Sequence, residues 1–268
     1  MSIKDIDFNE LYMKQKKSTT FQPKSQKEWD QKAIHISKRI YKSVYNQELI
    51  EQIDTKGCKS MLDVGCGAGN ISLLMSSKLE KIYALDFSTV MLDNLKAQMQ
   101  KRAIKNIEPI HLSWEDDWSE VPKCDIVLAS RSMEVANMKE ALEKLNNKAN
   151  KRVYLTYKVG GSFLNDDILD YIGKKINKKP DYIYTINILY QMGINPTISY
   201  IKSEGKSNQY ENAEAFMQSI IWSVGELDEK QTSLLREYYE KFIKNAKPQK
   251  DYLCWAVISW SKKSPPCL

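Results

Sequence analysis

The residues with the clearest chemical potential are three glycines spaced two apart. They lie in Asp63-Val64-Gly65-Cys66-Gly67-Ala68-Gly69-Asn70, between a short apolar run at 60–64 and a helical pattern at 71–79. Glycines allow a tight turn and a close approach of a ligand to the backbone, and amides at the start of the next helix could hold a carboxylate or phosphate. Asp86 closes a second apolar run, 17 residues after Gly69. That spacing is typical of an acid that binds ribose hydroxyls, so the segment predicts a cofactor site.

Metal and thiol chemistry find little support in the sequence. The five cysteines are scattered without a C-x-x-C pair, and the two histidines are far apart, so no metal site is expected. Free cysteines and an N-terminus without an apolar run favour a reduced, cytoplasmic setting. No apolar stretch reaches the length of about 18 residues that a membrane span requires, so no membrane partner is expected.

The elements that must position the glycine loop follow from the apolar pattern. Short apolar runs alternate with helical patterns, which predicts an α/β fold with a seven-stranded, doubly wound, mostly parallel sheet. The N-terminal residues 26–53 are predicted to form helices, and a helical insertion precedes the last strand. The predicted strands are 60–64, 81–86, 106–112, 124–130, 151–157, 196–202 and 253–260, and the main helices are 89–102, 138–149, 165–176, 181–193, 212–224 and 228–245.

Two segments resemble a known family. MLDVGCGAGNISLLM is similar to motif I of the class I S-adenosylmethionine-dependent methyltransferases, and YALDFSTVMLDNLKAQ is similar to the motif that follows it. The resemblance is close over roughly residues 58–158. The dehydrogenase loop, G-x-G-x-x-G, differs because the third glycine here comes one residue early. The resemblance implies a Rossmann-like methyltransferase fold, with S-adenosyl-L-methionine as cofactor and S-adenosyl-L-homocysteine as product.

The resemblance also implies roles for individual residues. The glycine loop would cradle the methionine end of the cofactor, Asp63 would orient the loop and the amino group, and Asp86 would accept from both ribose hydroxyls. Relatives often carry a Gly-Asp-Ala-like sequence beside the adenine, where this chain has Ser113 and Trp114, so the side chain that recognises the adenine amino group stays open. The full set of predicted cofactor residues is Asp63, Gly65, Cys66, Gly67, Gly69, Asp86, Phe87, Met91, Ser113, Trp114, Ser130, Arg131 and Trp29.

The segments outside the common core are predicted to close over the site. We expect a helical cap over residues 1–57, a cofactor-binding core over 58–202, an insertion over 203–250 that forms part of a substrate cap, and a final strand with a tail over 251–268. The alternative is that both outer segments pad the back of the sheet. Glu134 and Tyr157 lie just past strand ends and are the candidates for contact with the substrate or its leaving proton.

The composition and the absence of certain motifs limit the classes of methyl acceptor that the sequence favours. The formal net charge is +6, and the lysines are spread along the chain, which is more typical of a solvated surface than of a polyanion site. ASRSM follows the fourth strand instead of the motif of exocyclic-amine methylation. Aromatic residues of the last third could line an apolar pocket. We therefore expect in-line methyl transfer to a small-molecule acceptor. A methyltransferase acting on RNA or protein, and a regulatory module that binds the cofactor without catalysis, remain alternatives; nucleic acid is a possible partner, and the oligomeric state is open.

Overall fold

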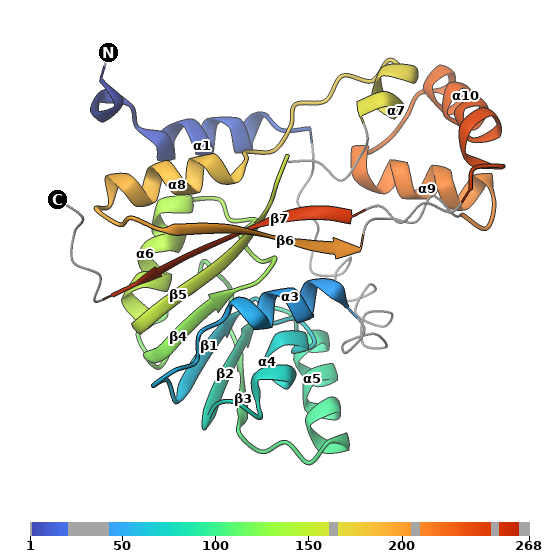
Figure 1. Ribbon diagram of the computed structural model, residues 1–268. Helices are drawn as coiled ribbons and strands as arrows, with labels where there is room; N and C mark the ends of the chain where they lie inside the picture. The colour runs from blue at the N-terminus through green and yellow to red at the C-terminus, as the bar shows by residue number, and fades with distance from the viewer. Residues whose placement is uncertain (1, 21–42, 161–165, 205–209, 248–251, 263–268) are drawn as a thin grey trace.

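A computed structural model describes residues 2–20, 43–160, 166–204, 210–247 and 252–262. Seven strands form one sheet in the order β3-β2-β1-β4-β5-β7-β6 (Figure 1). Strands β1 to β5 pair in parallel, whereas β7 is antiparallel to both of its neighbours. The prediction of a seven-stranded, mostly parallel, doubly wound sheet is confirmed. The strands are β1 (Ser60–Val64), β2 (Lys81–Asp86), β3 (Ile107–His111), β4 (Cys124–Ala129), β5 (Ala149–Lys158), β6 (Thr197–Glu204) and β7 (Tyr252–Ser261).

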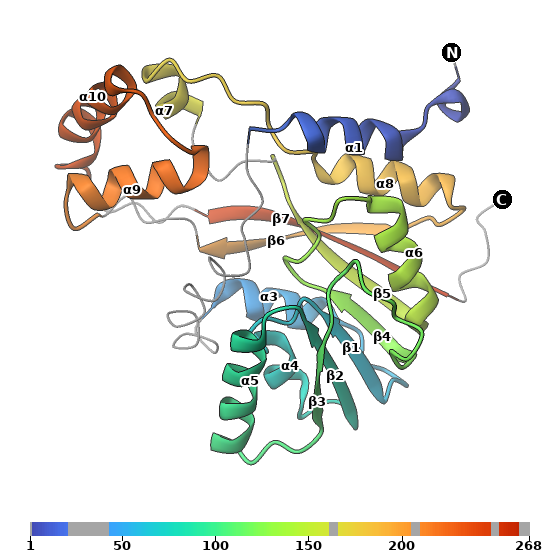
Figure 2. The same ribbon diagram turned by 180° about the vertical axis from the view of Figure 1, so that it is seen from behind.

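Alternating side chains of the strands build two apolar cores, one on each face of the sheet. In β1, Leu62 and Val64 join one core and Met61 joins the other, as expected for a strand whose side chains alternate and are buried on both faces. Helices cover both faces (Figures 1 and 2). The first core packs against α1 (Phe8–Ser18), α6 (Met138–Lys148) and α8 (Tyr182–Gln191), and the second against α3 (Val44–Gln52), α4 (Asn70–Met75) and α5 (Thr89–Lys101).

Helix α1 lies in the segment 1–57 that is expected to be a helical cap, but it precedes the helices expected over 26–53. Its sequence is polar, but Asp7 caps it by accepting from the Glu10 amide, and Tyr12 is fully buried. The Tyr12 hydroxyl donates to the Val135 carbonyl at 2.8 Å, and its ring meets Tyr184 edge-on. One aromatic anchor therefore fixes a helix that the apolar pattern does not reveal. A 3₁₀ turn, η1 (Ile3–Asp5), precedes it.

The insertion forms a third, smaller core. It contains α9 (Ala213–Val224), α10 (Glu229–Tyr238) and a π-helical turn, η3 (Tyr239–Ile243), which pack with the short α7 (Asp166–Tyr171). This group stands at one side of the sheet (Figure 1). The helix expected over 228–245 is thus divided in two, and the one expected over 165–176 is only six residues long.

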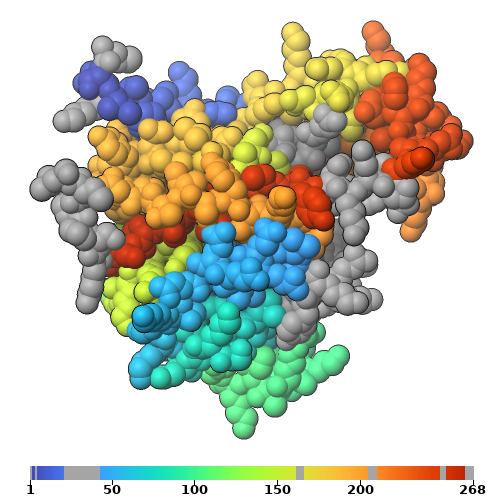
Figure 3. All heavy atoms as spheres, in the orientation of Figure 1, coloured from blue at the N-terminus to red at the C-terminus, as the bar shows by residue number. Residues whose placement is uncertain are grey.

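Helix α3 is the described part of the predicted N-terminal helices, since residues 21–42, with Trp29, lie outside the described chain. It packs along β6, the edge strand, and borders it on the front of the molecule (Figure 3). Among the described residues, no helix is long and apolar enough to cross a membrane.

Candidate functional site

The glycine loop is fastened to the end of β2. The amides of Gly65 and Cys66 both donate to the Leu85 carbonyl, at 2.7 and 3.0 Å, and the Gly67 amide donates to Oδ2 of Asp86 at 2.7 Å. Asp86 is buried, and its Oδ1 accepts from the Ser88 amide at 2.9 Å. The carboxylate therefore shapes the loop directly. Helix α4, which follows, has only six residues, so the loop amides rather than a helix terminus carry the polar chemistry here.

The three glycines serve different purposes. All have positive φ, at +68° for Gly65, +54° for Gly67 and +76° for Gly69, a region that side chains disfavour. A Cβ at Gly65 would lie 2.3 Å from Ser132 Cβ, and one at Gly69 would lie 2.3 Å from Leu95 Cδ1. At Gly67 the nearest atom would be 3.9 Å away. Packing within the protein therefore disfavours a side chain at Gly65 and Gly69, whereas a Cβ at Gly67 would make only an ordinary contact with Met91 Sδ.

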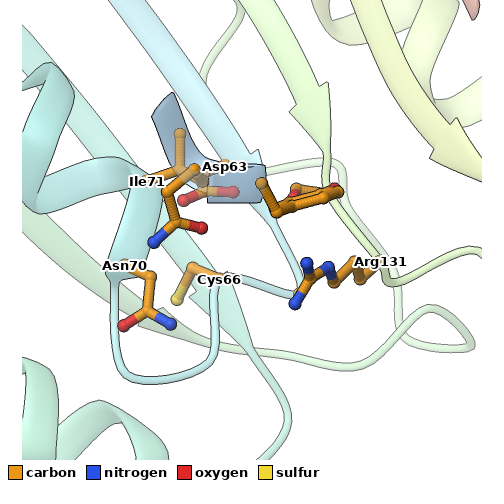
Figure 4. A pocket seen from close by; sticks show the side chains of 9 residues that line it. Asp63, Cys66, Asn70, Ile71 and Arg131 are labelled. Carbon is orange, nitrogen blue, oxygen red and sulfur yellow. The ribbon is translucent and has the colours of Figure 1, made fainter. Parts of the chain in front are cut away.

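A pocket of about 80 Å³ lies beside this loop, with β1, β4 and α3 around it (Figure 4). Its lining combines five residues expected from the sequence with four that were not. The expected ones are Asp63, Gly65, Cys66, Ser130 and Arg131, and the additional ones are Tyr45, Asn46, Asn70 and Ile71. Arg131 and Asn70 lie on opposite sides of the pocket, with Cys66 between them (Figure 4).

Arg131 supplies the positive charge of the pocket. Its backbone has φ of +58°, and its amide donates to Thr156 Oγ1 at 2.9 Å. The guanidinium carbon lies 3.4 Å from the centre of the Tyr45 ring. Among the described residues, no carboxylate is within ion-pair distance of Arg131, and Glu204 acts on it only from farther away. A guanidinium without an ion-pair partner among the described residues is a natural site for a ligand carboxylate.

The opposite side of the pocket carries acceptors. Asp63 is 1% exposed and accepts from Ser72 Oγ at 2.6 Å. Burial raises the pKa of the Asp63 carboxyl to about 6, and the nearby charge of Asp86 acts in the same direction. Oδ1 of Asn70 is buried without a hydrogen-bond partner. An ammonium group would satisfy both positions, because each lacks a donor or a counter-charge.

The predicted adenine-side residues lie past the ends of β2 and β3 and in α5. Phe87 is 38% exposed directly after β2, whereas Met91 is buried against Ala68 of the loop. Trp114 donates from Nε1 to the Ser132 carbonyl at 3.0 Å and packs on a second tryptophan. Ser113 closes a local turn, in which its hydroxyl accepts from the Glu115 amide.

The two predicted catalytic residues are not part of the pocket lining. Glu134 is held by Lys16 and Lys179, with contacts of 3.4 and 2.6 Å. Tyr157 donates to the Pro180 carbonyl at 3.2 Å. Both therefore help to hold α1 and the segment before α8, and their catalytic roles stay predictions. None of the described insertion residues 210–247 lines the pocket, whereas α3 does so through Tyr45 and Asn46. No described group of three His, Cys, Asp or Glu could hold a metal ion.

Sequence comparison places this architecture among known methyltransferases. A family described as "Methyltransferase domain" matches residues 61–151. An uncharacterized protein of Haemophilus influenzae is 36% identical over 267 residues, which cover 97% of this chain and 98% of that protein. A demethylmenaquinone methyltransferase of Leptospira interrogans is 28% identical over 174 residues, 63% of this chain and 64% of its own length.

Solved structures with the same fold include the YcgJ protein of Bacillus subtilis. Its TM-score is 0.54 at 15% identity, with 82% of this chain and 99% of that chain covered. Strand order, the single antiparallel strand and the glycine loop after β1 define a class I methyltransferase fold. This chain belongs to the class I S-adenosylmethionine-dependent methyltransferases and is an enzyme of that family.

Proposed function

We propose that this enzyme transfers a methyl group from S-adenosylmethionine to a small-molecule acceptor, and that the pocket beside the glycine loop holds the methionine end of the cofactor. The observation that carries this proposal is the charge pattern of the pocket. Arg131, which has no ion-pair partner in the described part of the chain, faces the buried acceptors of Asp63 and Asn70. This arrangement complements an α-amino acid, whose carboxylate and ammonium carry opposite charges.

The other binding roles follow once the methionine end of the cofactor is placed in this pocket. Gly67 leaves room for a ligand beside the loop, since no atom would lie closer than 3.9 Å to a Cβ there. Asp86 can accept further hydrogen bonds, because each carboxylate oxygen has a second lone pair, and it is assigned to the ribose hydroxyls. Phe87 and Met91 are assigned to the adenine, with Ser113 and Trp114 near its edge.

The chemistry asks little of the protein beyond alignment. S-adenosylmethionine, when bound, supplies an electrophilic methyl group on a sulfonium with a neutral leaving group. The chain's part is to orient the reactants and to exclude water. Burial raises the pKa of the Tyr45 phenol, which stays protonated and hydrogen-bonded to Ser130 and Thr156 at 2.9 and 2.7 Å. Its role is therefore structural rather than that of a base.

A small-molecule acceptor is favoured by the name of one relative and by the missing nucleic-acid motifs. The relative from Leptospira is named for a quinone precursor. A probable ribosomal RNA methyltransferase of Methanosphaera stadtmanae also matches, at 30% identity, but over only 91 residues and 33% of this chain. A match of this length is expected between two methyltransferases that share only the cofactor-binding core.

Two measurements test the proposal. Calorimetry should show one molecule of S-adenosylhomocysteine bound per chain, and failure of the wild-type protein to bind it would refute the cofactor assignment. The enzyme should then be incubated with a cell extract and with S-adenosylmethionine labelled in the methyl group. The products should afterwards be separated by size. Label in the low-molecular-weight fraction supports a small acceptor, and label only in RNA or protein overturns it.

A further inference from the structure

Tyr45 occupies the centre of a network that joins α3 to β5, β7 and the segment after β4. It lies in α3, is 1% exposed, and its hydroxyl contacts Ser130 Oγ after β4 and Thr156 Oγ1 in β5. Its ring lies 3.4 Å below the guanidinium carbon of Arg131 and meets Trp255 of β7 edge-on at 5.5 Å. No other described aromatic ring lies so close to a guanidinium.

The same network holds the backbone of Arg131 in an unusual conformation. The φ of +58° is uncommon for a residue with a side chain and persists only where neighbours enforce it. Thr156 Oγ1 accepts from the Arg131 amide at 2.9 Å and contacts the Tyr45 hydroxyl at 2.7 Å. One tyrosine therefore supports both the main chain and the charged head of Arg131.

Tyr45 owes its position to the docking of α3 on the edge strand. The Val44 amide donates to Glu204 Oε1 at 2.6 Å, and the Lys202 amide donates to Glu48. Leu49, one turn after Tyr45, is fully buried in the core of that face. The cation of the pocket is thus correctly placed only when α3 lies on β6.

We infer that Tyr45 is a positioning residue that makes the site selective for ligands with an α-carboxylate, by carrying the Arg131 guanidinium on its ring. The inference rests on the proposed function, because it assumes that the pocket receives the methionine end of the cofactor. A guanidinium stacked on a ring keeps its hydrogen-bonding edge free for a planar carboxylate. Since Tyr45 belongs to α3, carboxylate binding and α3 docking reinforce each other through linkage.

The test compares two ligands that differ in the amino-acid end. S-adenosylhomocysteine has it, and 5′-deoxy-5′-methylthioadenosine lacks it; the ratio of their dissociation constants measures recognition of that end. Arg131→Met should weaken S-adenosylhomocysteine binding on the order of 10- to 100-fold, as loss of a charge-assisted pair does, and change the second ligand little. Tyr45→Leu should lower the ratio in the same direction, and Tyr45→Phe, which keeps the ring, should preserve it within a few-fold.

A matched control separates positioning from general damage. Tyr12 is also fully buried and hydrogen-bonded, but it lies in the other core, so Tyr12→Leu should lower stability and leave the ligand ratio unchanged. The double variant Tyr45→Leu, Arg131→Met should be no worse than Arg131→Met alone, because both act through one guanidinium. If Tyr45→Leu does not fold, Tyr45→Met replaces it.

Three results would overturn the inference while leaving the proposed function intact. They are an unchanged ligand ratio in Tyr45→Leu, equal weakening of both ligands, or fully additive effects in the double variant. Hydrogen exchange gives an independent readout: S-adenosylhomocysteine should slow exchange of the α3 amides more than methylthioadenosine does at equal saturation. Equal protection by both ligands would show that carboxylate binding does not stabilise the docking of α3, and would contradict the inference. Wild-type protein that binds neither ligand would instead refute the proposed function itself.

Discussion

Replacing Asp63 by Asn should stabilise the ligand-free protein at neutral pH. The Asp63 carboxyl is 1% exposed, its hydrogen-bond donor is the neutral Ser72 hydroxyl, and its pKa is raised from 3.8 to about 6. In the unfolded chain the same carboxyl ionises near its ordinary pKa. Between about pH 4 and pH 6 the folded state therefore holds the proton more tightly, and stability falls as the pH rises through this window.

The size of the effect follows from the shift. About two pKa units at about 1.4 kcal/mol each correspond to roughly 3 kcal/mol lost between pH 4 and pH 7. For a protein of this size that is on the order of 5–10 °C in Tm. An Asn side chain is neutral and can still accept from Ser72, so Asp63→Asn should recover most of this at pH 7.5 and little at pH 4.

Thermal melts of both proteins between pH 4 and pH 8, without ligand, measure the difference directly. Ser72→Ala is a useful control, because loss of its hydroxyl should raise the Asp63 pKa further and widen the pH dependence. A lower Tm for Asp63→Asn at pH 7.5, with the slope against pH unchanged, would show that the carboxylate is stabilising and the reasoning is wrong. The stabilised variant should also bind S-adenosylhomocysteine more weakly, which is the expected opposition between stability and function.

Three further outcomes are expected. Gly67→Val should keep the fold but lose S-adenosylhomocysteine binding, whereas Gly69→Val should lower the Tm, because its Cβ would lie 2.3 Å from Leu95. Thermal melts and calorimetry measure both effects. The reverse behaviour of the two variants would show that the roles of the two glycines are wrongly assigned. Asp86→Ala should weaken binding at least tenfold, since it removes an acceptor worth about 1.5–3 kcal/mol together with the anchor of the loop; unchanged affinity in calorimetry would contradict that role. The predicted catalytic role of Glu134 requires that Glu134→Gln lower turnover and leave the affinity for S-adenosylhomocysteine nearly unchanged; its carboxylate is bound by Lys16 and Lys179 outside the pocket lining, and unchanged turnover would refute that role.

The sequence predicts the sheet well because local signals determine it. Continuous apolar runs such as 126–129 are buried on both faces, and most of the runs are followed by a helical pattern, so strand number and class follow without knowledge of contacts. Helix α1 cannot be predicted in this way, since its stability comes from Tyr12 packing against residues more than a hundred positions away. The π-helical turn after Tyr238 is likewise not encoded by any apolar period.

The candidate site likewise has a part that the sequence predicts and a part that depends on distant contacts. The loop from Asp63 to Asn70 and its contact with Asp86 follow from spacing, because they connect neighbouring strands. Tyr45 could not be found from the sequence, since its value depends on α3 lying on β6, more than 150 residues later. Position past a strand end also selected Glu134, and the lysines of α1 and of the segment before α8 that contact it could not be found from that position.

The placement of β7 has a consequence for synthesis on the ribosome. This strand follows all the others along the chain, yet it lies between β5 and β6 and pairs with both over seven or more residues. Until residues 252–261 emerge, β5 has an open edge and β6 has no strand to join. The nascent chain can assemble β1 to β5 early, but it must keep two unpaired edges from associating with other chains. The closing step is therefore the late insertion of β7 between two strands that precede it in the chain.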